Sequence, residues 1–170
     1  LEKNQKYLGI VVFIFVFILS FTNASNKLST MALVKKFSPT FFEACDWVKA
    51  NLRDNISLYT IWAHRAVYNC QRNAVGTSTV PDIALSKDLN KTLEAARANG
   101  ITHIFIQKFS IDPANRHYSE NYDLDFIEFL EANPEHFVKV YENGASLEQC
   151  RQYWQAGYQC DGNIIYEIKW

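Results

Sequence analysis

An uncharged apolar run near the start of the chain constrains this protein more than any other feature of its sequence. Residues 7–21 contain no charged side chain, and every one except Gly9 and Ser20 is apolar or aromatic. The run is somewhat shorter than the roughly 20 apolar residues that cross a bilayer, and Thr22 and Ala24 extend it at little cost. A buried strand or core helix is rarely so long and so uniformly apolar. We therefore expect membrane attachment.

The form of this attachment leaves alternatives open. A cleavable signal peptide has a charged start, an apolar stretch and a small-residue cleavage site, which residues 22–25 match weakly. A transmembrane helix, either a lone anchor or the last span of a polytopic protein, fits the run better. The sequence begins with Leu1, as expected of a fragment or a processed product. Lysines lie on both sides of the run, so the positive-inside rule does not decide the orientation.

Three segments follow from this interpretation. We assign residues 1–25 to an N-terminal transmembrane helix with its flanks, 26–38 to a juxtamembrane connector and 39–170 to an α/β domain. A chain of 170 residues with 48% hydrophobic composition has enough apolar material for one domain with a core, but not for a second. The formal net charge of −1 gives no electrostatic reason to expect nucleic acid as a partner.

Hydrophobic periodicity places helices and strands in alternation along the domain. Helices are expected over residues 39–52, 89–99, 122–132 and 147–155. Strands are expected over residues 56–63, 101–106, 137–141 and 164–168, with a short one within 74–80 and a turn at 142–144. Residues 64–72 fit either a short helix or a loop.

The segment from residue 89 to 106 carries most of the fold prediction. Its helix stops at Asn99-Gly100 and leads at once into an apolar strand, which is half of a β-α-β unit. Together with the alternation elsewhere, this predicts an α/β sandwich with a mixed sheet. Six side chains on apolar faces or central strands are expected to be largely buried: Trp47, Ile104, Phe105, Phe129, Val140 and Ile165.

The four cysteines, Cys45, Cys70, Cys150 and Cys160, lack the close spacing of a zinc site. They fit either small buried residues or, in an outward-facing domain, one or two disulfides. Cys150 and Cys160 are nearest in sequence and are the pair that we single out.

Candidate ligand-binding residues follow the first predicted strand, where open α/β sheets place ligand sites. His64 and Arg65 are suited to a phosphate or carboxylate, and Tyr68 and Arg72 are expected to line the same cleft. The alternative is a loop whose polar side chains face water.

Catalytic chemistry is harder to find. The loop residues Asp112, Arg116, His117, Glu120 and Asp123 cluster in sequence, but loop spacing does not make ligands converge on a metal. Asp123-Leu124-Asp125 has the DxD pattern of nucleotide-sugar sites, although carboxylates also stabilise a helix N-terminus. The chain has no GxGxxG, phosphate loop, GxSxG or HExxH motif, so we assign no catalytic residue and no metal site.

The order of four segments carries a family resemblance. They are Trp47-Val48-Lys49-Ala50-Asn51, Gly100-Ile101-Thr102, Tyr141-Glu142-Asn143-Gly144 and Tyr166-Glu167-Ile168. Placed after a hydrophobic span, this pattern resembles the C-terminal soluble domain of polytopic lipid-linked-sugar glycosyltransferases, which include protein mannosyltransferases and aminoarabinose transferases. The resemblance covers most of residues 39–170. Residues 113–122 and the cysteines fall outside the pattern.

The resemblance implies an accessory domain on the outer side of the membrane. Its motifs mark structural elements, and the family's acidic catalytic residues lie among upstream membrane spans that this chain does not contain. It implies membrane lipid, a lipid-linked sugar and an acceptor as partners, no cofactor in this chain, and a divalent metal in the missing catalytic part. The alternative function is a singly anchored outer-surface or periplasmic binding domain without enzymatic activity. Upstream coding sequence separates the two, because many more hydrophobic spans favour the first.

Overall fold

The computed structural model describes residues 38–112, 122–156 and 158–170, and its centre is a mixed five-stranded sheet. The strand order is β2-β1-β3-β7-β6. These strands span Ser57–Thr60 (β1), Asn73–Gly76 (β2), His103–Gln107 (β3), Phe137–Gly144 (β6) and Gly162–Ile168 (β7). β1 pairs in parallel with β2 and β3, whereas β7 is antiparallel to β3 and β6. The predicted α/β class with a mixed sheet is confirmed.

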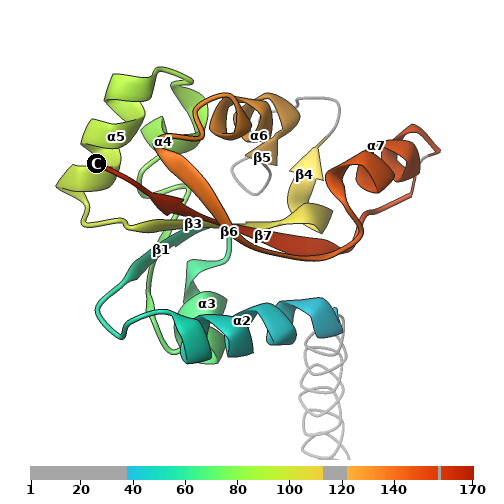
Figure 1. Ribbon diagram of the computed structural model, residues 1–170, viewed down its shortest axis with the longest axis horizontal. Coiled ribbons are helices and arrows are strands. Elements are labelled where there is room, and N and C mark those ends of the chain that lie inside the picture. Colours follow the sequence, from blue (N-terminus) through green and yellow to red (C-terminus); the bar gives the residue numbers. More distant parts are fainter. Residues whose placement is uncertain (1–37, 113–121, 157) are drawn as a thin grey trace, which may run out of the picture. The chain divides into compact units, whose positions relative to one another are not determined.

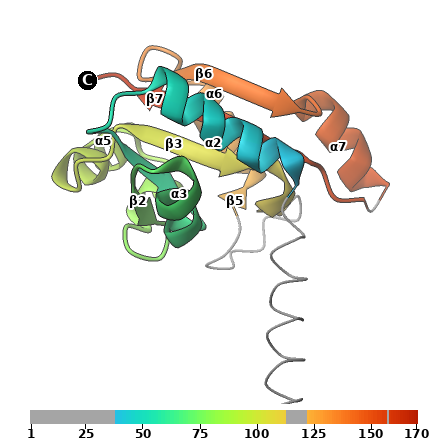
Figure 2. The same cartoon turned by 90° about the horizontal axis from the view of Figure 1, so that it is seen from below.

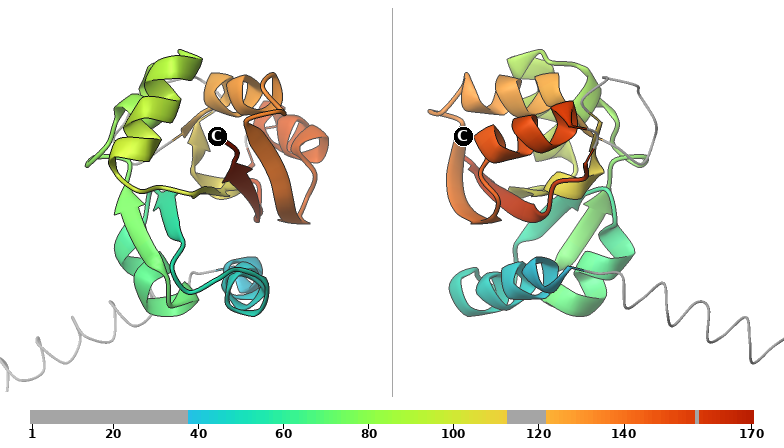
Figure 3. Two further views of the ribbon diagram at one scale, coloured as in Figure 1. Left: turned by 60° about the vertical axis from the view of Figure 1, so that its left-hand side comes forward. Right: turned by 90° about the vertical axis from the view of Figure 1, so that its right-hand side faces the viewer.

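Helices cover both faces of this sheet (Figure 1). One face carries α2 (Pro39–Asn51) and α3 (Ala63–Cys70), and the other carries α4 (Asp82–Leu85), α5 (Leu89–Ala98) and α6 (Leu124–Glu131). Figure 3 shows the two helical layers separated by the sheet. The last helix, α7 (Leu147–Gln155), follows β6 and precedes β7. A short 3-10 turn, Lys108–Ser110, leads from β3 to a small parallel pair, β4 (Ile111–Asp112) and β5 (Tyr122–Asp123).

The apolar run at residues 7–21 lies outside the described residues. Within residues 38–112, 122–156 and 158–170, no helix is long and apolar enough to cross a membrane.

Three of the six predicted core residues are fully buried. Ile104, Phe105 and Ile165 are 0% exposed, as expected of β3 and β7, which have neighbours on both sides. Trp47, Phe129 and Val140 are less completely buried than the other three. Trp47 and Val140 lie at the edge strand β6: the Trp47 ring stacks on Tyr141 at 4.7 Å, and Val140 falls at the irregularity in the β6–β7 register. An edge strand leaves one side of its side chains uncovered.

Local predictions failed where pairing overrides propensity. The predicted turn at residues 142–144 is instead the end of β6, because Glu142, Asn143 and Gly144 pair with the start of β7. The first strand ends at Thr60, and residues 64–72, left open between helix and loop, contain α3.

Strand direction gives the sheet two distinct ends. The parallel strands β1 and β3 finish at the end where β6 finishes and β7 begins, since Gln107 and Asn143 both pair with Asn163. We call this the carboxyl end and the opposite one the amino end. Helix α2 starts at the carboxyl end, where Thr40 Oγ1 accepts a hydrogen bond of 3.3 Å from the Asn163 amide, and runs back along the sheet (Figure 2).

Candidate functional site at the carboxyl end of the sheet

A buried polar pair closes the carboxyl ends of β1 and β3. The Gln107 amide donates to Thr60 Oγ1 at 3.1 Å, and the Thr60 hydroxyl lies 3.3 Å from Gln107 Oε1. Both side chains are almost completely buried, so each supplies the hydrogen bond that the other needs away from water. This pair joins the last residue of β1 to the last residue of β3, so the two strands end side by side.

Four residues meet above this pair. The Trp62 and Phe109 rings, which follow β1 and β3, contact each other at 5.0 Å between centroids. The Arg65 guanidinium lies 4.4 Å from the centre of the Trp62 ring, in cation–π geometry, and its Nε donates to His64 Nε2 at 3.4 Å. We call these residues the Trp62 cluster: Trp62, His64, Arg65 and Phe109. Phe109 and the Thr60–Gln107 pair were missed in the sequence, because nothing local shows that β1 and β3 are neighbours.

The Trp62 cluster combines a cation with apolar rings. Desolvation lowers the pKa of Arg65 from its usual value, but a guanidinium remains charged at neutral pH. A planar cation beside aromatic rings suits a phosphate or carboxylate attached to an apolar group.

The other two predicted ligand residues lie elsewhere. Tyr68, on the outward side of α3, is 83% exposed. Arg72 is 8% exposed, and its guanidinium donates to the carbonyls of Lys49 and Leu52 at 3.2 and 2.8 Å and pairs with Asp54 at 3.0 Å. These carbonyls belong to the end of α2, where helix carbonyls lack intrahelical partners. Arg72 therefore closes α2 at the amino end and does not join His64 and Arg65.

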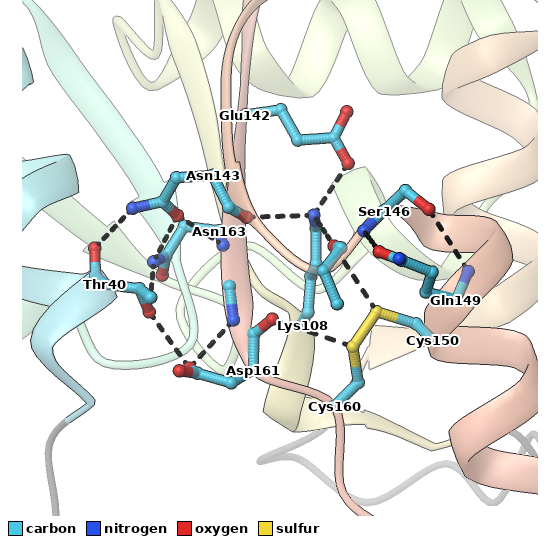
Figure 4. The surroundings of a disulfide bond; sticks show 12 residues. Thr40, Lys108, Glu142, Asn143, Ser146, Gln149, Cys150, Cys160, Asp161 and Asn163 are labelled. Atoms are coloured by element: carbon cyan, nitrogen blue, oxygen red, sulfur yellow. Dashed lines mark hydrogen bonds and ion pairs between the residues drawn. A yellow bond between two sulfur atoms is a disulfide. The ribbon is translucent and has the colours of Figure 1, made fainter.

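A buried lysine holds the neighbouring part of the carboxyl end (Figure 4). Lys108 is 0% exposed, and its Nζ donates to Glu142 Oε1 at 2.7 Å and to the carbonyls of Asn143 and Ala145 at 3.1 and 2.5 Å. An ammonium has three N–H donors, so these acceptors satisfy it completely. Burial alone raises the pKa of Glu142, but Lys108 and Lys139 outweigh that effect and lower it below the usual value. The arrangement is structural, because every donor is used within the fold.

An amide and a carboxylate fasten the start of α2 to the same end (Figure 4). The Asn143 side chain donates to the Thr40 carbonyl at 2.9 Å and accepts from the Asn163 backbone N–H at 3.0 Å. Asp161 accepts hydrogen bonds from the hydroxyls of Ser38 and Thr40. Asn143 and Glu142, both in a segment of the resemblance, thus have structural contacts.

Two disulfides lie on opposite sides of this region. The structure joins Cys150 to Cys160, the pair singled out from the sequence, across the residues between α7 and β7. It also joins Cys45 on α2 to Cys70 at the end of α3, a pairing that sequence distance did not indicate.

The predicted loop cluster offers no described site. Arg116, His117 and Glu120 lie outside the described residues, as do the side chains of Asp112 and Asp123. Asp125 of the DxD segment pairs with Lys87 at 3.0 Å. In the part of the chain that the structure describes, no three His, Cys, Asp or Glu residues are grouped so as to hold a metal ion.

A separate open hollow of about 590 Å³ lies at the amino end. Its lining includes His103, Glu167 and Trp170. Burial lowers the pKa of His103, which keeps its imidazole neutral at pH 7. None of His64, Arg65, Tyr68 or Arg72 lines this hollow.

Comparison with known proteins gives a fold relationship. No protein family and no curated protein matches the sequence. Among solved structures, the fold is similar to the C-terminal globular domain of an oligosaccharyltransferase, AfAglB-S2, from Archaeoglobus fulgidus, with a TM-score of 0.50 and 13% identity. The match covers 79% of this chain and 99% of that domain. At this identity the similarity concerns the fold alone.

Proposed function

We propose that this chain is the accessory extracytoplasmic C-terminal domain of a membrane glycosyltransferase that uses a lipid-linked sugar donor. The observation that carries the proposal is the fold similarity, which spans almost the whole C-terminal domain of an oligosaccharyltransferase. The segments around Trp47, Thr102, Asn143 and Tyr166 favour the group that includes protein mannosyltransferases and aminoarabinose transferases.

The disulfides support an extracytoplasmic location independently. All four cysteines are paired, and disulfides persist in oxidising compartments but are rare in the cytosol. An apolar run at residues 7–21 ahead of such a domain fits attachment to a membrane with the domain on its outer side.

In this proposal the Trp62 cluster contacts the anionic part of the lipid carrier or the acceptor. Arg65 provides the charge and the Trp62 and Phe109 rings provide apolar surface, a combination that suits a phosphate on a hydrocarbon chain. Sugar transfer also needs a base for the acceptor and stabilisation of the leaving phosphate. We assign these roles, and any divalent metal, to parts of the parent protein upstream of this chain.

The test is transfer from a lipid-linked donor by the parent protein in membranes. We expect Arg65→Ala to lower transfer by about 10- to 100-fold, the effect of losing a charge-assisted hydrogen bond of roughly 1.5–3 kcal/mol. Arg97→Ala is the matched control, because Arg97 lies over Trp170 at 4.9 Å in a similar cation–π pair outside the Trp62 cluster. Equal activity of the two variants would remove the Trp62 cluster from the proposal.

A second measurement separates an accessory domain from an enzyme. We expect the 170-residue chain alone to show no transfer, with or without divalent metal. Turnover by this chain that a single substitution abolishes would refute the accessory role.

A further inference from the structure

The first described residues of the chain are fastened to the carboxyl end of the sheet. The hydroxyls of Ser38 and Thr40 both donate to Asp161, and the Thr40 carbonyl accepts from Asn143. Asp161 directly follows Cys160, so it comes immediately after the disulfide-closed segment 150–160. The connection to residues 1–37 therefore begins beside this segment.

Exposed aromatic side chains flank this attachment point. Phe42, in the first turn of α2, is 42% exposed, and Tyr153 and Tyr158 in the segment 150–160 are 45% and 69% exposed. The Tyr158 N–H donates to the Tyr153 carbonyl at 2.8 Å, so the two tyrosines belong to one compact turn. The Cys150–Cys160 disulfide closes this turn and limits the conformations available to both rings.

Tyrosine and phenylalanine at such positions suit the boundary of a lipid bilayer. Tyrosine has an apolar body and a polar tip, and it is enriched where membranes meet water. Held at a fixed position, an exposed ring reaches this boundary with little loss of conformational entropy.

The sequence next to the attachment point identifies the same partner. Residues 22–37 separate the apolar run from Ser38, and they contain Lys27, Lys35 and Lys36 but no acidic residue. Their apolar members are Ala24, Leu28, Met31, Ala32, Leu33, Val34 and Phe37, with Phe21 just before them. Where the adjoining leaflet contains anionic lipids, a basic stretch beside a membrane span is attracted to their headgroups by about 1 kcal/mol per lysine.

We propose that Phe42, Tyr153 and Tyr158 form a contact surface for the lipid bilayer, with their rings at the headgroup boundary. This proposal rests on the membrane attachment in the proposed function, and it adds which surface of the domain meets the lipid. The carboxyl end of the sheet, with the Trp62 cluster, is then the end nearer to the membrane, where a lipid-linked substrate is available.

The experiment measures the depth of single residues in the full chain reconstituted into vesicles of phosphatidylcholine with one-fifth phosphatidylserine. All four natural cysteines are paired, so Phe42→Cys, Tyr158→Cys and Ala98→Cys each introduce one thiol for an environment-sensitive fluorophore. Ala98, the exposed last residue of α5, is the control. Lipids with a spin label near the headgroup quench fluorophores that reach a few Å into the boundary. Intact mass before labelling verifies that both disulfides have formed.

We expect quenching at residues 42 and 158 to exceed that at residue 98 by at least about twofold, because bound rings lie within about 5–10 Å of the headgroup boundary. Equal quenching at all three positions overturns the proposal. A blue-shifted but unquenched fluorophore at residue 158 also overturns it, since that result indicates a protein partner or a second copy of the chain.

Failure of this inference and failure of the proposed function give different results. A chain that does not float with the vesicles refutes membrane attachment and with it this contact surface. A floating chain with unquenched residues 42 and 158 refutes the contact surface alone. If one variant fails to form both disulfides, the other decides, because Phe42 lies on α2 whereas Tyr158 lies between α7 and β7.

Discussion

Lys108 is the residue whose environment departs most from expectation. Lysine is almost never fully buried unless its charge is paired, yet this side chain is 0% exposed. Glu142 and the carbonyls of Asn143 and Ala145 take all three of its donors, which ties the turn after β3 to the end of β6 and to the residue that follows it. The Asn143 side chain in turn holds the start of α2.

Glu142→Gln should therefore destabilise the domain. The substitution leaves the buried ammonium without its charged partner, and we expect a loss of about 2–3 kcal/mol in the free energy of unfolding, measured by denaturant melts. Glu148→Gln is the control, because Glu148 is 75% exposed and its ion pair with Arg151 spans 4.0 Å. A control loss above about 0.5 kcal/mol, or no difference between the variants, would contradict this assignment.

The same carboxylate predicts a pH dependence. The pKa of Glu142 in the folded state lies below its ordinary value of 4.5, because Lys108 and Lys139 outweigh the opposing effect of burial. Its stabilising contribution is therefore complete above pH 4.5 and is lost as the pH falls through the folded-state pKa. We expect the stability difference between wild type and Glu142→Gln to shrink when melts at pH 6 are compared with melts below pH 4. A difference that stays constant between these pH values would show that the charge of Glu142 does not contribute to the stability of the fold.

A substitution at Gly144 tests how closely β6 and β7 approach each other. The φ of Gly144 is +71°, and an added Cβ would lie 2.5 Å from Gly162 Cα and 2.6 Å from the Asp161 carbonyl oxygen. Gly100 has a similar φ of +64° but nothing within 4 Å of an added Cβ, which makes it a matched control. We expect Gly100→Ala to cost about 1–2 kcal/mol from backbone strain alone and Gly144→Ala at least about 2 kcal/mol more in denaturant melts. Equal losses would mean that β6 and β7 separate easily here.

At the scale of elements, α2 is held by contacts with several other elements. Phe41 stacks on Phe105 of β3 at 5.8 Å, Cys45 is bonded to Cys70 of α3, and Trp47 stacks on Tyr141 of β6. Arg72 closes its last turn. These contacts hold α2 along its length, from the residues bonded to Asp161 to the amino end of the sheet.

The two disulfides should contribute unequally to stability. The chain-entropy model gives about 3.5 kcal/mol for the Cys45–Cys70 loop, with a separation of 25 residues, and about 2.8 kcal/mol for Cys150–Cys160, with a separation of 10. We expect Cys45→Ser/Cys70→Ser to lower the unfolding free energy more than Cys150→Ser/Cys160→Ser, although both remain folded at room temperature. Calorimetry of the two double variants measures the contribution of each disulfide, and calorimetry of the wild type with a reductant measures both together. A wild-type melting temperature that a reductant does not change would contradict both.

For the whole molecule, the prediction to test is its association with a membrane. The uncharged run at residues 7–21 predicts that the full chain remains in the membrane pellet after alkaline carbonate extraction and is released by detergent. Insertion of two arginines, Ile14→Arg and Val16→Arg, should release it, because each costs about 2.5–3.5 kcal/mol at the centre of a span. Release of the unmodified chain by carbonate alone would refute the attachment.

The sequence predicted those elements whose signals are local. Ser38-Pro39 marks the start of α2 and Asn99-Gly100 the stop of α5, because caps and turns depend on a few adjacent side chains. The same local signals failed at Glu142-Asn143-Gly144, which resembles a turn. These residues extend β6 because Ile164, Asn163 and Gly162 lie opposite them, and this pairing is invisible in the isolated segment.

The candidate site likewise contains residues that the sequence predicted and residues that it did not. His64 and Arg65 were predicted because they follow an apolar strand, and Arg65 does meet Trp62 there. Phe109 lies in the 3-10 turn after β3, 47 residues after Trp62, and the Cys45–Cys70 pair joins two helices. Arg72 was expected beside His64, but α3 carries it to the other end of the sheet, where it binds the carbonyls of α2.

The sequence by itself determined the α/β class of this chain, because its helices and strands follow from periodicity and caps. Its one long apolar run predicts membrane attachment. Such features depend on neighbours within a few residues, where backbone propensity and hydrophobic patterning act. The tertiary structure alone decided which strand ends meet, and so which side chains form the Trp62 cluster, why a lysine at position 108 is buried, and that Cys45 pairs with Cys70. The physical reason is that each of these contacts joins groups distant in sequence, and only burial of the shared core brings them within reach of one another.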